Sequence, residues 1–139
     1  MTPPDQFKPA IENGGRAEPV EIWKARKFIE EHSAEELSLS KVAKATNISP
    51  NYLSEKFKEV TGINFVDYIN RIRFERACRL LQDVDVRVSE IAFAVGFQSL
   101  SQFNRVFKKL SGKSPSYYRA AESRRRVGET LSEKTRRNA

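Results

Sequence analysis

Between about residues 19 and 120 the apolar residues recur every three or four positions, and no run alternates apolar and polar residues as a strand does. The first stripe holds Ile22, Ala25 and Ile29, on a helix that begins at Pro19 and ends near residue 32. Later stretches repeat this spacing as far as residue 120. The pattern predicts an all-helical protein.

The segment after the first helix is predicted to be a loop. Ser33 and Glu36 have the spacing of a capping box, but the Leu-Ser alternation that follows comes too soon for a full helix. A short helix then runs from Lys41 to Thr46, and Asn47, a residue that tolerates left-handed backbone, ends it.

A second helix follows this turn almost at once. Ser49 is a good N-cap, Pro50 stands at the first helical position, and the helix reaches Thr61 before Gly62 stops it. Two helices joined by so tight a turn form a helix-turn-helix unit, which we place at residues 39–62.

The unit occurs twice in the sequence. A shift of 49 residues places Val42, Ala43 and Ile48 on Ile91, Ala92 and Phe97. A shift of 50 places Leu53, Phe57, Lys58, Val60 and Gly62 on Phe103, Phe107, Lys108, Leu110 and Gly112. Ser99 and Gln102 form a capping box at the start of the second helix of the later copy. We therefore place a second unit at residues 88–112.

A long helix at residues 64–81, about 27 Å in length, is predicted to connect the units. Its first half carries one apolar stripe and its second half another on nearly the opposite side, so each half should pack on a different unit. The first stripe is Phe65, Ile69 and Ile72, and the second is Phe74, Ala77, Cys78 and Leu81.

The fold class is therefore all-α, with two helix-turn-helix subdomains, a connector helix and about seven helices, in a domain spanning residues 19–120. Residues 1–18, with three prolines and a Gly-Gly pair, are expected to be a flexible lead-in. Residues 121–139 are rich in arginine, and we expect a solvated, disordered basic tail.

The solvent-facing sides of the second helix in each unit carry hydroxyls, amides and charges. These are residue types that read base edges or hold phosphates. At 100° per residue the exposed sets are Asn51, Ser54, Glu55 and Lys58 in the first unit, and Ser101, Asn104, Arg105 and Lys108 in the second. Two such helices about 34 Å apart would enter successive major grooves on one face of a duplex. One chain could then bind as a monomer.

Charge and composition narrow the function further. The 139 residues include 25 Lys and Arg against 18 Asp and Glu, a net charge of +7 that attracts polyanions. One His and one Cys leave no nucleophile and base pair, no metal cluster and no disulfide, so we expect no enzyme, no metal and no cofactor. No apolar run approaches the roughly 18 residues of a membrane span, and the first 15 residues lack a signal peptide core. We expect a protein of the cytoplasm.

The paired units resemble the DNA-binding domain of the AraC/XylS family of bacterial transcription regulators over about residues 20–120. The residues that carry the resemblance fall in both units. In the first half they are Val42-Ala43, residues 49–53, Phe57-Lys58, Thr61-Gly62 and Tyr68-Ile69. In the second they are Ile91-Ala92, residues 95–97, residues 103–105, residues 107–109, residues 112–115 and Tyr118-Arg119.

The resemblance implies a two-lobed, seven-helix monomer that binds an asymmetric site in double-stranded promoter DNA and usually activates transcription through RNA polymerase. By position it adds Gln102 to the eight DNA-contacting residues named above. Two positions depart from the family pattern, because Leu100 stands where many relatives are polar and Glu55 stands where a basic or amide residue is frequent. Many relatives also carry an effector-binding or dimerisation domain.

Two other function classes remain as alternatives, a helical protein-interaction module and an RNA-binding domain. RNA binding favours exposed aromatic rings for base stacking, whereas the outer faces here carry amides, hydroxyls and cations. A protein-interaction module needs an exposed apolar patch, for which only Trp23, Phe28 and Leu100 are candidates. A reader of double-stranded DNA is the better match.

Overall fold

The computed structural model describes residues 18–138, with side chains as far as residue 128, and in this range it contains seven α-helices and no strand. The helices are α1 Val20–His32, α2 Leu39–Thr46, α3 Pro50–Thr61, α4 Phe65–Leu80, α5 Val88–Ala94, α6 Leu100–Ser111 and α7 Pro115–Asn138. The all-α class is confirmed. The predicted lead-in lies outside the described residues except for Glu18. In the described range no helix is long and apolar enough to span a membrane.

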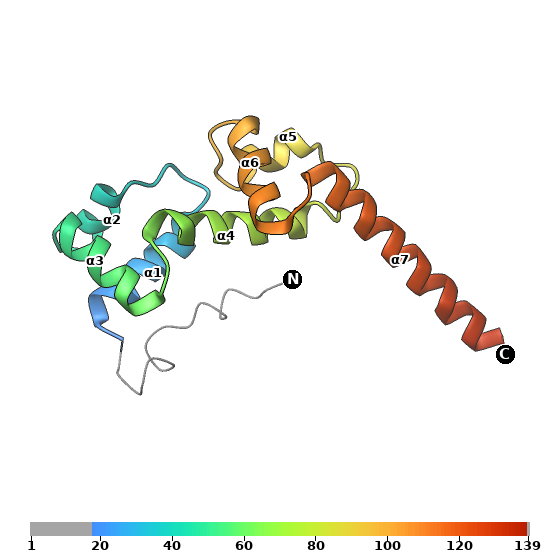
Figure 1. Ribbon diagram of the computed structural model, residues 1–139, viewed down its shortest axis with the longest axis horizontal. Coiled ribbons are helices and arrows are strands. Elements are labelled where there is room, and N and C mark those ends of the chain that lie inside the picture. The colour runs from blue at the N-terminus through green and yellow to red at the C-terminus, as the bar shows by residue number, and fades with distance from the viewer. Residues whose placement is uncertain (1–17, 139) are drawn as a thin grey trace.

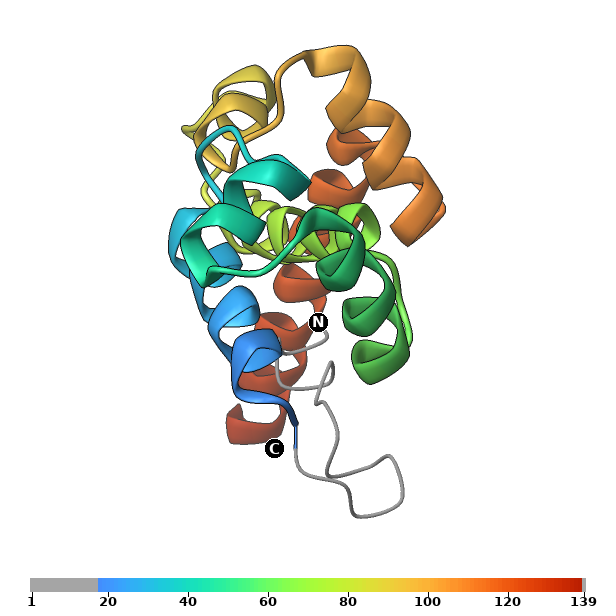
Figure 2. The same cartoon turned by 90° about the vertical axis from the view of Figure 1, so that its left-hand side faces the viewer.

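The connector helix α4 forms the axis of the molecule (Figure 1). Helices α1, α2 and α3 gather at one end of α4, and α5 and α6 lie against its other half. Helix α7 leaves the second group and extends away from the body. An end-on view shows α3 and α6 on the same side of α4, toward the right of the picture (Figure 2).

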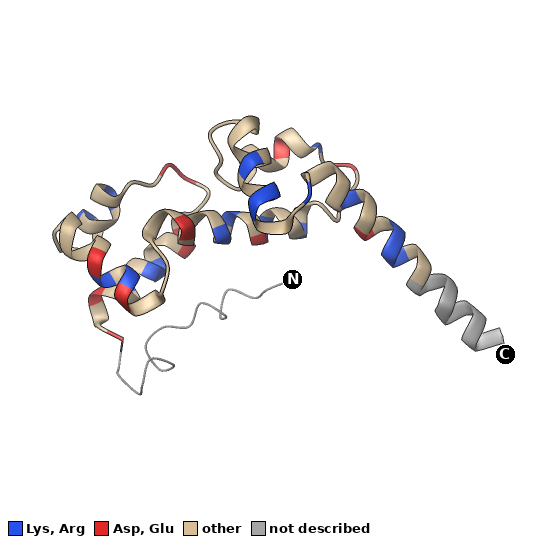
Figure 3. Ribbon diagram, in the orientation of Figure 1, with Lys and Arg blue, Asp and Glu red and all other residues tan. Residues whose placement is uncertain are grey.

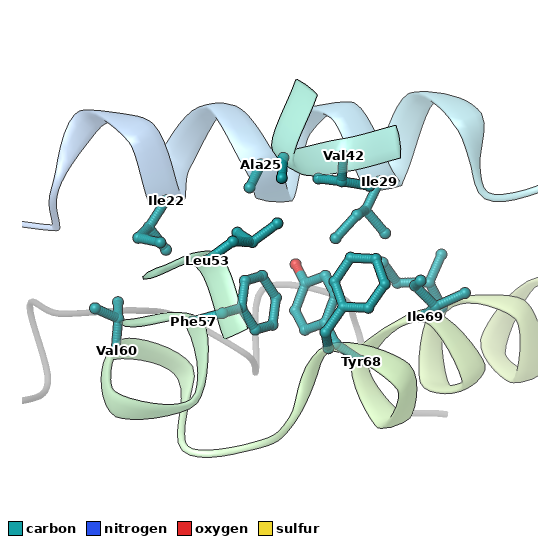
Figure 4. Packing of buried hydrophobic residues seen from close by; sticks show 12 residues of the cluster. Ile22, Ala25, Ile29, Val42, Leu53, Phe57, Val60, Tyr68 and Ile69 are labelled. Atoms are coloured by element: carbon teal, nitrogen blue, oxygen red, sulfur yellow. The ribbon is translucent and has the colours of Figure 1, made fainter. Parts of the chain in front are cut away.

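The first unit has its own hydrophobic core, built from α1, α2, α3 and the first half of α4 (Figure 4). Ile22, Ala25 and Ile29 are fully buried along α1, as the stripe predicts. At the centre the rings of Phe57 and Tyr68 pack edge to face, with centroids 5.0 Å apart and planes at 83°. This geometry suits the quadrupoles of two aromatic rings.

The second unit has a separate core on the other half of α4. Ala77, Cys78 and Leu81 are buried there with Ile91, Ala92 and the phenylalanines of α6, and Phe74 packs against them. The equivalent of Phe57 is Phe107, which is buried against Phe103, Phe74 and Tyr118. The prediction that the two halves of the connector pack on different units is confirmed.

One local prediction is wrong. Helix α2 begins at Leu39 rather than Lys41, because the Ser38 Oγ accepts from the Lys41 backbone N–H and caps the helix. The loop predicted after the first helix is present at residues 33–38, and Ser33 is buried there as the C-cap of α1.

The basic C-terminal segment also differs from the expectation of disorder, because α7 continues to Asn138. Arginine is a good helix former and the segment contains no proline. Arg125 pairs with Glu122 at 2.8 Å, an i, i+3 contact that favours the helix.

Candidate nucleic-acid interface

The turn of the first unit is set by Asn47, which has φ 60° and ψ 42°. In this left-handed conformation its backbone N–H donates to the Ala43 and Lys44 carbonyls, and the Ile48 N–H also donates to Ala43. The chain therefore reverses within three residues and reaches Ser49, whose Oγ accepts from the Tyr52 backbone N–H at 3.1 Å.

Helix α3 presents its polar face outward because Leu53, Phe57 and Val60 fix the opposite face in the core. All four residues predicted to contact DNA from this helix are exposed. They are Asn51, Ser54, Glu55 and Lys58. Of these, neither Glu55 nor Lys58 forms an ion pair within the part of the chain whose side chains are described.

Helix α6 repeats the arrangement, with Phe103, Val106 and Phe107 buried and the opposite face exposed. The exposed predicted residues are Ser101, Asn104, Arg105 and Lys108. Gln102 is half-buried, and its side-chain oxygen accepts from the Gln98 backbone N–H at 3.1 Å. Its backbone N–H donates to the Ser99 Oγ at 3.0 Å. Gln102 therefore stabilises the start of the helix in addition to any contact with a ligand.

The two outer helices differ in charge. Helix α3 carries two lysines and two glutamates, and Lys56 pairs with Glu59 at 3.5 Å. Helix α6 carries Arg105, Lys108 and Lys109 and no carboxylate (Figure 3). A polyanion is therefore attracted more strongly to the second unit than to the first.

Between α4 and α6 lies a pocket of about 400 Å³ that the sequence analysis did not predict. Asn70 and Arg71 line it from the connector helix, and Arg105 and Lys109 line it from α6. The connector was interpreted only as a spacer, because its polar positions fall between two apolar stripes and carry no periodic signal of their own. The polar surface that includes Arg105 therefore extends from α6 onto α4.

A further contact braces the start of α3 against α1. The Tyr52 hydroxyl donates to Glu21 Oε1 at 2.7 Å. This hydrogen bond raises the pKa of Tyr52 and lowers the pKa of Glu21. The partners are 31 residues apart, so no local sequence pattern indicates them.

Residues 42–121 match a protein family described as a helix-turn-helix domain. The chain is 44% identical over 94 residues to the HTH-type transcriptional regulator YijO of Escherichia coli K12, covering 68% of this chain and 33% of that protein. It is 31% identical over 103 residues to the HTH-type transcriptional regulator YisR of Bacillus subtilis 168, covering 74% and 36%. The chain thus spans about a third of the length of these relatives.

Solved structures give the same result. The C-terminal domain of AraT, a response regulator from Geobacillus stearothermophilus, superimposes with a TM-score of 0.73 at 36% identity, covering 76% of this chain and 88% of that domain. The DNA-binding domain of the global transcriptional factor AdpA, solved in complex with a target DNA, also has a TM-score of 0.73, at 28% identity over 77% of this chain and 96% of that one.

Proposed function

This chain belongs to the AraC-type helix-turn-helix family of DNA-binding transcription regulators, and from that premise we propose that α3 and α6 enter two successive major grooves on one face of a promoter duplex. The observation that carries the proposal is the placement of both outer helices on one side of α4 with their polar faces exposed (Figure 2). The proposed contacts are Asn51, Ser54, Glu55, Lys58, Ser101, Gln102, Asn104, Arg105 and Lys108.

Binding should be specific and sensitive to salt. Cations that neutralise phosphates release condensed counterions, so log affinity falls with log salt by about 0.9 for each phosphate contacted. The test is selection of duplexes from a random library, followed by titration of the selected and a scrambled duplex at several salt concentrations. An affinity that ignores salt, or that is equal for both duplexes, contradicts the proposal.

One molecule should occupy the whole site, because both readers belong to one chain. Sedimentation of the protein with the selected duplex measures the stoichiometry, and footprinting measures the length protected. We expect one chain per duplex and two protected segments about one helical turn apart. A strict requirement for two chains on a single site contradicts a monomeric reader.

We propose activation through RNA polymerase, at the bacterial chromosome, as the regulatory outcome, which is what the resemblance to the AraC/XylS family implies. Transcription in vitro from a promoter that carries the selected site tests this directly. Added protein should raise transcript yield at that promoter and leave a promoter with a scrambled site unchanged. A lowered yield indicates repression instead.

A further inference from the structure

The two units also touch beside the connector, through a loop of the first unit and a turn of the second. The loop between α1 and α2 belongs to the first unit, and Gly96 lies in the turn between α5 and α6 of the second. A Cβ atom added at Gly96 would stand 2.3 Å from the Ser33 carbonyl oxygen, 2.8 Å from Arg73 Nε and 3.1 Å from Ala34 Cα. Gly96 also has φ 112°, a conformation that side chains disfavour. The contact therefore requires glycine.

Arg73 of α4 holds this contact together. Its Nε donates to the Ser33 carbonyl at 2.8 Å and its Nη2 donates to the Glu35 carbonyl at 2.9 Å. Its guanidinium carbon lies 5.8 Å from the ring centroid of Phe97, which belongs to the second unit. Only 7% of Arg73 is exposed. One buried cation thus binds the loop of one unit and the turn of the other.

Arg76, one helical turn further along α4, strengthens the first half of this contact. It donates to the Ser33 Oγ and to the Glu30 carbonyl. The two arginines together bind the α1–α2 loop through its carbonyls and a hydroxyl. These hydrogen bonds fix the α1–α2 loop to α4, and the same loop contacts Gly96 of the second unit.

The two cores share no buried residue among the described ones, and α4 contributes to both. With α4 as the shared helix, the orientation of each unit depends on how its core packs on that helix. The loop contact adds a second point of attachment, and two points of attachment oppose a change in that orientation.

We propose that Arg73 is a positioning residue that locks the two helix-turn-helix units in one relative orientation and thereby sets the half-site spacing that the chain accepts. The inference rests on the proposed function, because spacing matters only if both units read DNA. Each added base pair turns one half-site by about 35° about the duplex axis relative to the other. A protein whose two units are held in one orientation binds both rotated half-sites poorly, whereas a protein whose units can move relative to each other can still bind both.

The test compares Arg73→Met with Arg79→Met, a matched control that removes an exposed arginine of the same helix. Binding is measured on the selected duplex, on duplexes whose half-sites are moved apart one base pair at a time, and on duplexes with either half-site scrambled. On the selected duplex we expect Arg73→Met to lose about tenfold in affinity, because flexibility lowers the effective concentration of the second unit.

The spacing series separates positioning from a general loss of stability. With a single half-site, Arg73→Met should bind as the wild type does, and an added base pair should weaken it less than it weakens the wild type or Arg79→Met. Equal losses on every duplex, or an unchanged spacing dependence, overturn the proposal. If Arg73→Met does not fold, Arg73→Lys replaces it, because one ammonium group cannot reproduce the two guanidinium hydrogen bonds.

A second readout does not depend on DNA. Spin labels at Lys44→Cys and Arg87→Cys, both exposed and on different units, report the distance between the units, while Cys78 is buried and protected from labelling. The distribution of distances should be broader in Arg73→Met than in Arg79→Met, and identical distributions overturn the lock. Wild-type protein whose binding is unchanged when either half-site is scrambled contradicts the proposed function instead, whereas wild-type protein that ignores half-site spacing overturns the lock, so the two failures are distinguishable.

Discussion

At the scale of single residues, Cys78 is a packing residue whose ionisation is suppressed. Burial raises the pKa of its thiol to about 11, and burial raises the pKa of the neighbouring Tyr118 to about 12. In the unfolded chain the thiol ionises near pH 9. The folded state therefore favours the protonated thiol, and this contribution to stability is complete below about pH 9 and lost as the pH rises through about 11.

The corresponding prediction is a fall in the melting temperature over this alkaline range. Circular dichroism at a series of pH values measures it. Cys78→Ala should be less stable at neutral pH, because it leaves a cavity, yet its melting temperature should fall less steeply above pH 9. The decline should not vanish, since Tyr118 still titrates. An equally steep decline in the variant would show that the thiol does not contribute.

Glu55 and Arg105 occupy equivalent places in the two units and carry opposite charges, so the two readers should not prefer the same bases. Arg105 can donate to guanine O6 and N7, whereas Glu55 can accept from cytosine N4. Arg105→Ala should lower the binding free energy on the selected duplex by about 1 to 3 kcal/mol and relax the preference at one position. Lys108→Ala should weaken binding to all sequences alike. Competition with single-base variants of the duplex checks both, and unchanged specificity in Arg105→Ala contradicts its role.

At the scale of elements, the start of α7 stabilises the second unit through Arg119. Its Nε donates to the Leu81 carbonyl at 3.0 Å, and its Nη2 donates to the carbonyls of Asp83 and Val86 at 3.1 and 2.6 Å. One side chain thus closes the loop between α4 and α5. The sequence marks Arg119 only as the end of the family pattern, because its three acceptors lie more than 30 residues away.

Arg119→Ala should lower the free energy of unfolding by about 1 to 2 kcal/mol, a value reduced for the partial exposure of the guanidinium group. Urea denaturation measures the change. Arg124→Ala is the control, because Arg124 is exposed and makes one long hydrogen bond of 3.4 Å within its own helix. Equal destabilisation by the two variants would mean that the loop contacts of Arg119 contribute little.

The elements that the sequence predicted best are those whose ends are set by local contacts. Ser49 and Ser99 cap helices through the N–H three residues on, and Asn47 stops α2 by its own backbone conformation. The role of Ser33 could not be predicted, because its partners Arg73 and Arg76 lie some 40 residues later. Its spacing to Glu36 matches a capping box, but Ser33 instead ends α1.

At the scale of the whole molecule, the charge difference between α3 and α6 should make the second unit bind phosphates more strongly than the first. Lys109 is exposed and lies beside Arg105 in the pocket between α4 and α6. Lys109→Ala should reduce the slope of log affinity against log salt by about one and leave sequence preference intact. Arg79→Ala, which removes another cation of the same charge, should change the slope less. Titrations over a range of salt concentrations compare them, and equal slopes contradict a phosphate contact at Lys109.

The number of units could be predicted because the sequence pattern occurs twice. The division of the connector could be predicted because each half of that helix carries its own apolar stripe. How the units face one another could not. That relation depends on Ser33, Arg73 and Gly96, which are spread over both units and meet only after folding. The pocket between α4 and α6 escaped prediction for the same reason.

The different residues in the two turns have a consequence for how this protein can diverge. Asn47 occupies its left-handed turn with a side chain in place, whereas a side chain at Gly96 would run into the Ser33 carbonyl. A gene conversion that copied the first unit over the second would therefore bring asparagine into a space without room for it. Although the two units share a sequence pattern, one cannot replace the other. Each unit can therefore change its DNA preference only through substitutions in its own residues.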